Sequence, residues 1–250
     1  MNQSEKRNGN DPKTSLSSGS EISQSLIADL GSKNQTIRTK ARKSILALGE
    51  SAVGLLVEAL SSPNKRLRWE ANRLLDEMNV AWRKHADAKT ISALIRDLGS
   101  EDGMVRVRAR LALVTIGKRA VEALGKALTS KDDSKRWEVS KALGQIGDPG
   151  AVGILIRALE DKVFDVRWLA AEGLIKIGRP AIAPLLRAYI EKPDSLWLQE
   201  GVHHVLHDII NERLRGIVRP VLNALEDIEA ELEAPLAAEK ALNLLAELTS

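Results

Sequence analysis

The sequence of 250 residues contains no cysteine. This absence excludes disulfide bonds, thiolate nucleophiles and thiolate metal sites together. No apolar run has the length needed to cross a bilayer, and the N-terminus lacks the apolar core of a signal peptide. We therefore expect a cytoplasmic protein that makes no contact with a membrane.

Aromatic residues are scarce: they make up 3% of the chain, with a single Phe and a single Tyr. The core must therefore consist of Leu, Ile, Val and Ala, which suits closely approaching helices. Motifs of common enzyme classes are also missing, since we find no phosphate-binding glycine loop, no serine nucleophile elbow and no convergent pair of acids. We expect no cofactor and no catalytic residue, so that an enzyme is the less favoured interpretation.

The sequence does contain a repeat, which is clearest between residues 165 and 189. Gly178 is placed to end one helix in a left-handed conformation, and Pro180 stands where the next helix begins. The apolar residues of the first helix have the 3–4 spacing of one helical face: they are Val166, Ala170, Leu174 and Ile177.

The same helix pair recurs along the chain. The last core position of each first helix is Leu30, Leu60, Leu98, Leu128, Leu159, Tyr189 and Leu225, at spacings of 30, 38, 30, 31, 30 and 36 residues. A Gly follows nineteen residues later in four repeats, as Gly49, Gly117, Gly147 and Gly178. One helix pair cannot bury its apolar face alone, so the fold class is all-α: an α-solenoid of about six helix pairs with a C-terminal helical cap.

This pattern resembles the HEAT-repeat family, in particular the short bacterial and archaeal repeats also found in phycobilin lyases. The resemblance lies in Val166-Arg167, Ala170-Ala171, Leu174 and Ile177-Gly178, and in the equivalent residues from Val105 to Gly117. It implies that the second helices line a concave face. It says little about function, because such folds serve many partners.

The expected domain organisation is a disordered polar tail over residues 1–23 and one solenoid domain over 24–250. An irregular insertion near residues 79–89 accounts for the spacing of 38. Acidic capping helices occupy 211–250, with one helix from Ile217 to about Leu232, a break at Pro235 and a last helix to Leu248. Within the repeats, the residues placed to cap the second helices are Asn34, Asn64, Asp102 and Asp132.

An arginine occupies one position, eight residues after the core anchor, in five repeats. These residues are Arg38, Arg68, Arg106, Arg136 and Arg167. They could form a rail for an anionic ligand. We favour a structural ladder, because the resemblance implies that this Arg bonds to the Asp or Asn of the preceding turn.

A tryptophan follows three of these arginines, as Trp69, Trp137 and Trp168. The position lies at the margin of the buried stripe, so that either packing between repeats or partner binding explains it. Basic residues stand nearby on the second helices, among them Arg73, Arg108 and Lys141. We predict that these six residues bind a partner along the concave face.

Charge is unevenly distributed. Residues 24–128 contain nineteen Lys and Arg against eleven acids, whereas residues 190–250 contain five against twelve. A basic groove with interleaved aromatic residues is typical of nucleic-acid binding, but Glu70, Glu138 and Glu172 interrupt it. Nucleic acid is therefore the second choice of partner, after protein.

Three of the four histidines lie between residues 203 and 207. His203 and His207 are one helical turn apart and could share a metal ion with Glu200 as a third ligand. We expect no metal site, because two ligands alone seldom hold an ion and no outside ligand is evident.

The sequence thus predicts a non-catalytic scaffold or adaptor that binds a partner protein. A nucleic-acid-binding protein that uses the basic first half, and a phycobilin-lyase-like protein that handles a tetrapyrrole, are the alternatives.

Overall fold

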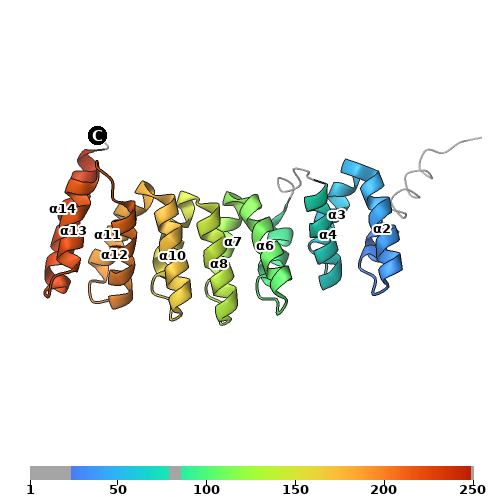
Figure 1. The fold of residues 1–250 in the computed structure, drawn as a ribbon, viewed down its shortest axis with the longest axis horizontal. Coiled ribbons are helices and arrows are strands. Elements are labelled where there is room, and N and C mark those ends of the chain that lie inside the picture. The colour runs from blue at the N-terminus through green and yellow to red at the C-terminus, as the bar shows by residue number, and fades with distance from the viewer. Residues whose placement is uncertain (1–23, 79–85, 249–250) are drawn as a thin grey trace, which may run out of the picture. The chain divides into compact units, whose positions relative to one another are not determined.

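The computed structural model describes residues 24–78 and 86–248. Across these residues the chain is helical and contains no strand, as Figure 1 shows. The polar tail predicted over 1–23 and most of the insertion predicted near 79–89 lie outside the described residues. Within the described part, no helix is long and apolar enough to cross a membrane.

The helices follow one another in pairs. Residues 24–30 are helical and pair with α2 (Gln35–Leu48). The later pairs are α3 (Val53–Ala59) with α4 (Lys65–Glu77), α5 (Ala88–Asp97) with α6 (Gly103–Ile116), α7 (Lys118–Ala127) with α8 (Asp133–Ile146), α9 (Val152–Ala158) with α10 (Phe164–Ile177), and α11 (Arg179–Glu191) with α12 (Leu196–Ile209). Short 3-10 turns, Gly49–Ala52 and Pro149–Ala151, precede α3 and α9. The predicted class, an all-α stack of helix pairs, is confirmed.

The chain divides into two compact units by its internal contacts. The single solenoid domain that the sequence predicts from residue 24 stays a prediction. Unit 1 comprises Met1–Ala93 and unit 2 comprises Leu94–Ser250. The division falls within α5.

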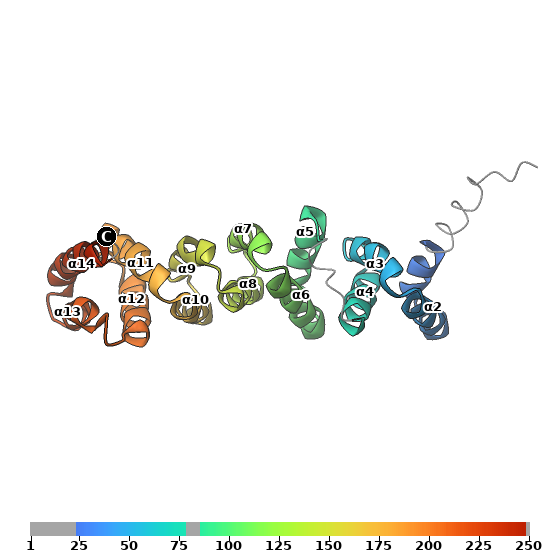
Figure 2. The ribbon, with the colours of Figure 1, turned by 90° about the horizontal axis from the view of Figure 1, so that it is seen from above.

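Unit 2 is built in two layers. In Figure 2 the first helices α7, α9 and α11 lie in one layer, and the second helices α8, α10 and α12 lie in the other. Aliphatic side chains fill the space between the layers, and Leu124, Leu143, Leu155 and Leu174 are fully buried. The single tyrosine, Tyr189, is the largest fully buried side chain.

The ends of the second helices follow the repeat pattern. Each of the four predicted caps accepts a hydrogen bond from a backbone N–H of the first turn, at 2.9–3.0 Å from the residue two positions later. The four predicted glycines all adopt positive φ, between 56° and 77°. These glycines turn the chain from one helix into the next, since φ in this range strains other residues.

Two further glycines set the spacing of neighbouring second helices. Gly144 in α8 and Gly173 in α10 face each other, and a Cβ added to either would lie 3.0–3.1 Å from the other's Cα. Since real Cβ atoms rarely approach backbone so closely, only glycine lets these helices come together here. The contact fixes the distance between the helices that bear Trp137 and Trp168.

The C-terminal cap differs from the prediction in two respects: its first helix ends at Leu225 and not near Leu232, and the break lies before Pro235. α13 (Arg215–Leu225) ends before a turn in which the Asp227 carboxylate accepts the Glu229 N–H at 3.2 Å, and α14 (Ala230–Glu247) follows. The break predicted at Pro235 is wrong, because this proline lies inside α14. Pro235 has no N–H, so the helix lacks one hydrogen bond to the carbonyl four residues earlier. Packing of α14 against α13 and α11 compensates for this loss.

Candidate functional site

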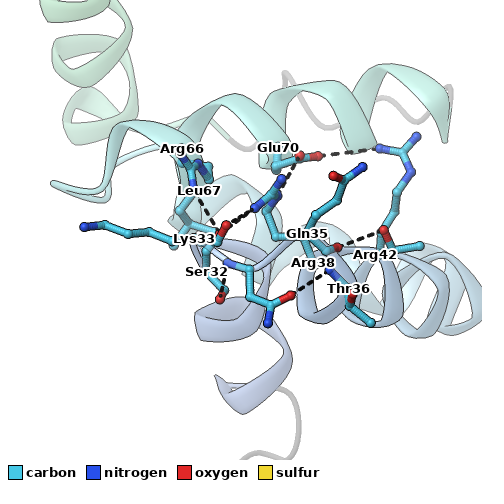
Figure 3. Close-up of polar contacts among 12 residues, drawn as sticks. Ser32, Lys33, Gln35, Thr36, Arg38, Arg42, Arg66, Leu67 and Glu70 are labelled. Carbon is cyan, nitrogen blue, oxygen red and sulfur yellow. Dashed lines mark hydrogen bonds and ion pairs between the residues drawn. The ribbon is translucent and has the colours of Figure 1, made fainter.

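The arginine ladder bonds to backbone carbonyls of the preceding turn. In each of the five repeats that carry this arginine, one guanidinium nitrogen donates to the carbonyl six residues earlier, at 2.8–2.9 Å. In the first three repeats it also donates to the next carbonyl, at 2.9–3.1 Å. Figure 3 shows this contact for Arg38 with Ser32 and Lys33.

The bonding partner thus differs from the cap side chain that we expected. Asn34, like the other three caps, already accepts backbone N–H groups of its own helix. The carbonyl oxygens of the turn that bond to the arginines lie before the helix and accept no hydrogen bond from a helical N–H. A planar guanidinium can bridge two of them. The arginines therefore tie each turn to the helix that follows it.

Two buried glutamates link neighbouring second helices through ion pairs. Glu138 in α8 accepts from Nε of Arg110 at 2.8 Å and lies 3.5 Å from Nε of Arg106, both in α6. In unit 1, Glu70 in α4 lies 3.8 Å from Arg38 and 3.7 Å from Arg42 (Figure 3).

These ion pairs neutralise four arginines of the second helices. Arg110 also donates to the side-chain oxygen of Gln145 at 2.6 Å, and Arg42 also pairs with Glu77. Burial lowers the pKa of Arg42, and the charge of Arg73 lowers it further, against the opposing effect of Glu70. The basic residues that suggested a nucleic-acid groove are thus partly neutralised within the protein.

Two predicted anchors are half-buried and covered by a cation. The guanidinium of Arg73 lies 5.3 Å from the ring centroid of Trp69, in unit 1, and the ammonium of Lys141 lies 4.4 Å from that of Trp137, in unit 2. Each cation stands one helical turn after its tryptophan. The third predicted basic residue, Arg108 in α6, is half-buried in unit 2.

Trp168 is the most exposed of the three predicted tryptophans, with 47% of its surface accessible, and it belongs to an aromatic cluster on α10 and α12. Its ring centroid lies 6.2 Å from that of Phe164 and 4.4 Å from that of His204. The guanidinium of Arg167 lies 5.6 Å from the Phe164 ring and 4.7 Å from the Trp197 ring. We call Phe164, Arg167, Trp168, Trp197 and His204 the aromatic cluster.

The aromatic cluster faces water. Phe164 is 60% exposed and Trp197 is 43% exposed. Large aromatic side chains that meet on an open surface are typical of the centres of protein interfaces. Sequence reasoning treated Trp197 only as a break in the arginine column. The signal was present, because Trp197 stands at the position of Arg167 in the next repeat and Phe164 stands four residues before Trp168.

The predicted histidine candidates bind carboxylates of the chain. His203 Nε2 lies 2.9 Å from Glu226 and His207 Nδ1 lies 2.9 Å from Asp208. The hydrogen bond from His203 lowers the pKa of Glu226. Glu200 is exposed, and the part of the chain that the structure describes contains no group of three acidic, His or Cys residues suited to a metal ion.

An open groove of about 460 Å³ lies elsewhere in unit 2, between α11 and α14. It is lined by Arg179, Pro180, Ala183, Arg187, Leu242, Leu245 and Ala246. None of the residues of the aromatic cluster contributes to it.

Comparison with known proteins supports the repeat assignment. The family model described as HEAT repeats matches residues 121–206, from within α7 to within α12. No curated protein is significantly similar to the chain.

Solved structures of repeat proteins resemble the fold at low identity. The phycocyanin lyase complex of CpcE and CpcF from Nostoc sp. PCC7120 is 20% identical, with 98% of this chain and 99% of that chain covered and a TM-score of 0.39. An engineered protein is 23% identical over 75% of this chain and 96% of that chain, with a TM-score of 0.41. A designed armadillo repeat protein in complex with the peptide (KR)4 is 16% identical over 89% and 99%, with a TM-score of 0.36.

These similarities concern the repeated helical fold alone. The residue pattern and the family match agree on the type of repeat, as the sequence analysis predicted. Residues 121–206 therefore match HEAT repeats.

Proposed function

We propose that the protein is a non-catalytic, cytoplasmic scaffold that binds a partner protein through the layer of second helices. The observation that carries this proposal is the exposed aromatic cluster of unit 2. The rings are carried by α10 and α12, which pack against each other, and Gly144 and Gly173 hold α10 close to α8. A preformed surface of this kind loses little conformational entropy when a partner docks, so more of the contact energy remains as affinity.

The predicted anchors have different roles in this proposal. Trp168 supplies open aromatic surface together with Phe164 and Trp197. Trp69 and Trp137 present less of their surface, because Arg73 and Lys141 lie over their rings. With Arg108, these two cations are the residues that we propose to orient acidic groups of the partner.

Nucleic acid is the weaker alternative, since Glu70 and Glu138 pair with four arginines of the second helices. A protein that neutralises phosphates with these side chains would first have to break those pairs. A tetrapyrrole-handling role of the phycobilin-lyase type remains a prediction, and no residue of the aromatic cluster supports it specifically.

The test is affinity capture of the tagged protein from its native lysate, with and without nuclease. The proposal predicts a defined protein that is retained after nuclease and at raised salt, because aromatic burial is insensitive to screening. Retention that disappears with nuclease and falls steeply with salt would assign the surface to nucleic acid. Pigment that is retained with the protein would favour the tetrapyrrole-handling role.

A further inference from the structure

The outer side of α14 carries exposed leucines. The helix packs against α11 and α13 through small residues, since Ala230, Ala234, Ala238 and Ala241 are buried. The leucines that face water are Leu232 at 68% exposure, Leu236 at 53%, Leu244 at 43% and Leu248 at 56%. We call these four residues the leucine row.

The leucine row differs from an ordinary exposed helix face. The solvent-facing side of an amphipathic helix normally carries polar and charged residues. Single exposed apolar residues are common, but here they recur every four residues apart from Lys240, which stands between Leu236 and Leu244. Residues at this spacing form a ridge on a helix, and such a ridge is the feature that fits into the grooves of another helix. Ile228, fully exposed in the preceding turn, extends the apolar surface at one end.

Acidic side chains surround the leucine row. Glu229, Glu233, Glu239 and Glu247 are all exposed, and Lys240 is the single basic residue of α14. A partner that covers the leucines must place its own flanking residues beside these carboxylates. Basic residues would be attracted there, whereas acidic residues would be repelled.

The same charges argue against a second copy of this chain as the occupant. Two α14 helices packed against each other would bring glutamates on one helix close to glutamates on the other. Like charges brought together at an interface weaken association. The surface therefore matches a partner of different composition.

We propose that the leucine row is a docking surface for an amphipathic helix of a partner protein, with an apolar row and flanking Lys or Arg residues. The ridge of α14 would fit the grooves of that helix at a crossing angle of about −50°, the usual result when rows of this spacing interdigitate. This surface lies on α14 and the aromatic cluster lies on α10 and α12, so that the two share no residue.

The test uses two synthetic helical peptides and the full-length protein. Both peptides are about as long as α14, which has 18 residues, and both carry a leucine row. One has lysines on either side of the row and the other has glutamates. Fluorescence anisotropy of labelled peptide measures binding to the wild type, to Leu232→Gln/Leu236→Gln, to Glu229→Gln/Glu233→Gln, and to Leu111→Gln. Leu111 is a matched control in α6, because it is also exposed, at 51%.

We expect the lysine peptide to bind the wild type and the Leu111→Gln control equally. Loss of the two leucines should weaken binding roughly tenfold or more, since the apolar area that the peptide would cover is replaced by polar side chains. Loss of the two glutamates should weaken it less and reduce its dependence on salt. The substituted residues are exposed, so that unchanged helical circular dichroism and melting confirm an intact fold.

Three results would overturn the proposal. The first is equal binding of both peptides, and the second is binding of the lysine peptide that survives loss of the leucines, because that is charge attraction alone. The third is a homodimer of the wild type, seen by analytical ultracentrifugation, that the leucine variant abolishes. That outcome would assign the leucine row to a second copy of the chain.

Discussion

Gly144 and Gly173 face each other where α8 and α10 cross, with room for a hydrogen but not for a methyl group on either residue. A Cβ at Gly144 would meet the Gly173 Cα at 3.1 Å. The obstacle is backbone, which cannot rotate aside as a side chain can. The spacing of the two helices that bear Trp137 and Trp168 thus depends on the absence of two methyl groups.

Gly144→Ala should therefore destabilise the protein. In a helix interior, alanine normally stabilises by about 1 kcal/mol relative to glycine. Here overpacking should outweigh that gain and leave a net loss of about 1–2 kcal/mol in urea unfolding. Gly153→Ala in α9 is the matched control, because an added Cβ there meets nothing within 4 Å. If Gly144→Ala stabilises as much as the control does, the close approach is not a constraint.

Loss of the Glu138 carboxylate should cost more than loss of the Glu70 carboxylate. Glu138→Gln leaves Arg110 and Arg106 without their counter-charge, and the Glu138 and Arg110 side chains are only 5% and 10% exposed. Removing one partner of such a buried pair costs about 3 kcal/mol. Glu70 is a weaker case, because its pairs are 3.7–3.8 Å long and its arginines are about 20% exposed. Urea unfolding of both variants compares the two, and equal losses would contradict this ranking.

Replacing an arginine of the ladder by lysine should lower the stability of the fold. Arg106 bridges the carbonyls of Ser100 and Glu101 with one nitrogen, at 2.8 and 3.1 Å. A lysine ammonium lacks the planar fork that holds this geometry, so Arg106→Lys should lose about 1 kcal/mol in the free energy of unfolding. Were the arginines a rail for an anionic ligand, lysine would preserve the charge and the stability together. Thermal melting of Arg106→Lys beside Arg119→Lys, an arginine outside the ladder, distinguishes these roles.

The phenol of Tyr189 should link stability to alkaline pH. Burial, and then the charge of Glu231, raise the pKa of this group above the usual value of 10.0. The folded state thus disfavours the tyrosinate, and this contribution to stability is present below pH 10 and is lost as pH rises through the raised pKa. Tyr189→Phe has no phenol to ionise and should not lose this stability. Its melting temperature should therefore fall less than that of the wild type above pH 10.

A direct readout exists because the chain contains a single tyrosine. The ultraviolet absorbance of tyrosinate therefore follows Tyr189 alone. Ionisation of the folded protein above pH 10 is the expected result. A midpoint near 10 in the folded state would show that the phenol is not shielded.

Much of the fold could be predicted from the sequence because it depends on local residue types. Asn34 and Asp102 cap helices by the rules of helix ends, and Gly117 and Gly178 adopt positive φ where the pattern required it. Pro235 shows the limit, since its place inside α14 depends on packing against other helices and not on its own preference.

The aromatic cluster depends even more on tertiary register. Phe164 and Trp197 are 33 residues apart, and they meet through Arg167 only because α12 lies beside α10. Likewise, Glu138 could be seen to interrupt the basic stripe, but nothing local showed that it would bind Arg106 and Arg110. Contacts between successive repeats follow from how the helices stack, which the periodicity of one helix does not specify.

The central claim is that the aromatic cluster binds a partner protein, and the double variant Trp168→Ala/Trp197→Ala tests it. Loss of two central aromatic anchors should weaken binding by about 2 kcal/mol or more, which is roughly a thirtyfold change. Stability should change little, because both side chains are about half exposed. Met104→Ala in α6 is the control, since it also removes an exposed apolar side chain, one that is 58% accessible.

The most direct measurement is therefore capture from the native lysate by wild type, double variant and control in parallel, with the melting temperature of each recorded. The account predicts a protein that the wild type and Met104→Ala retain after nuclease and that the double variant loses, while all three melt at similar temperatures. Equal retention by the double variant would contradict the claim. A collapse of its melting temperature would also contradict it, because the tryptophans would then serve to pack the repeats.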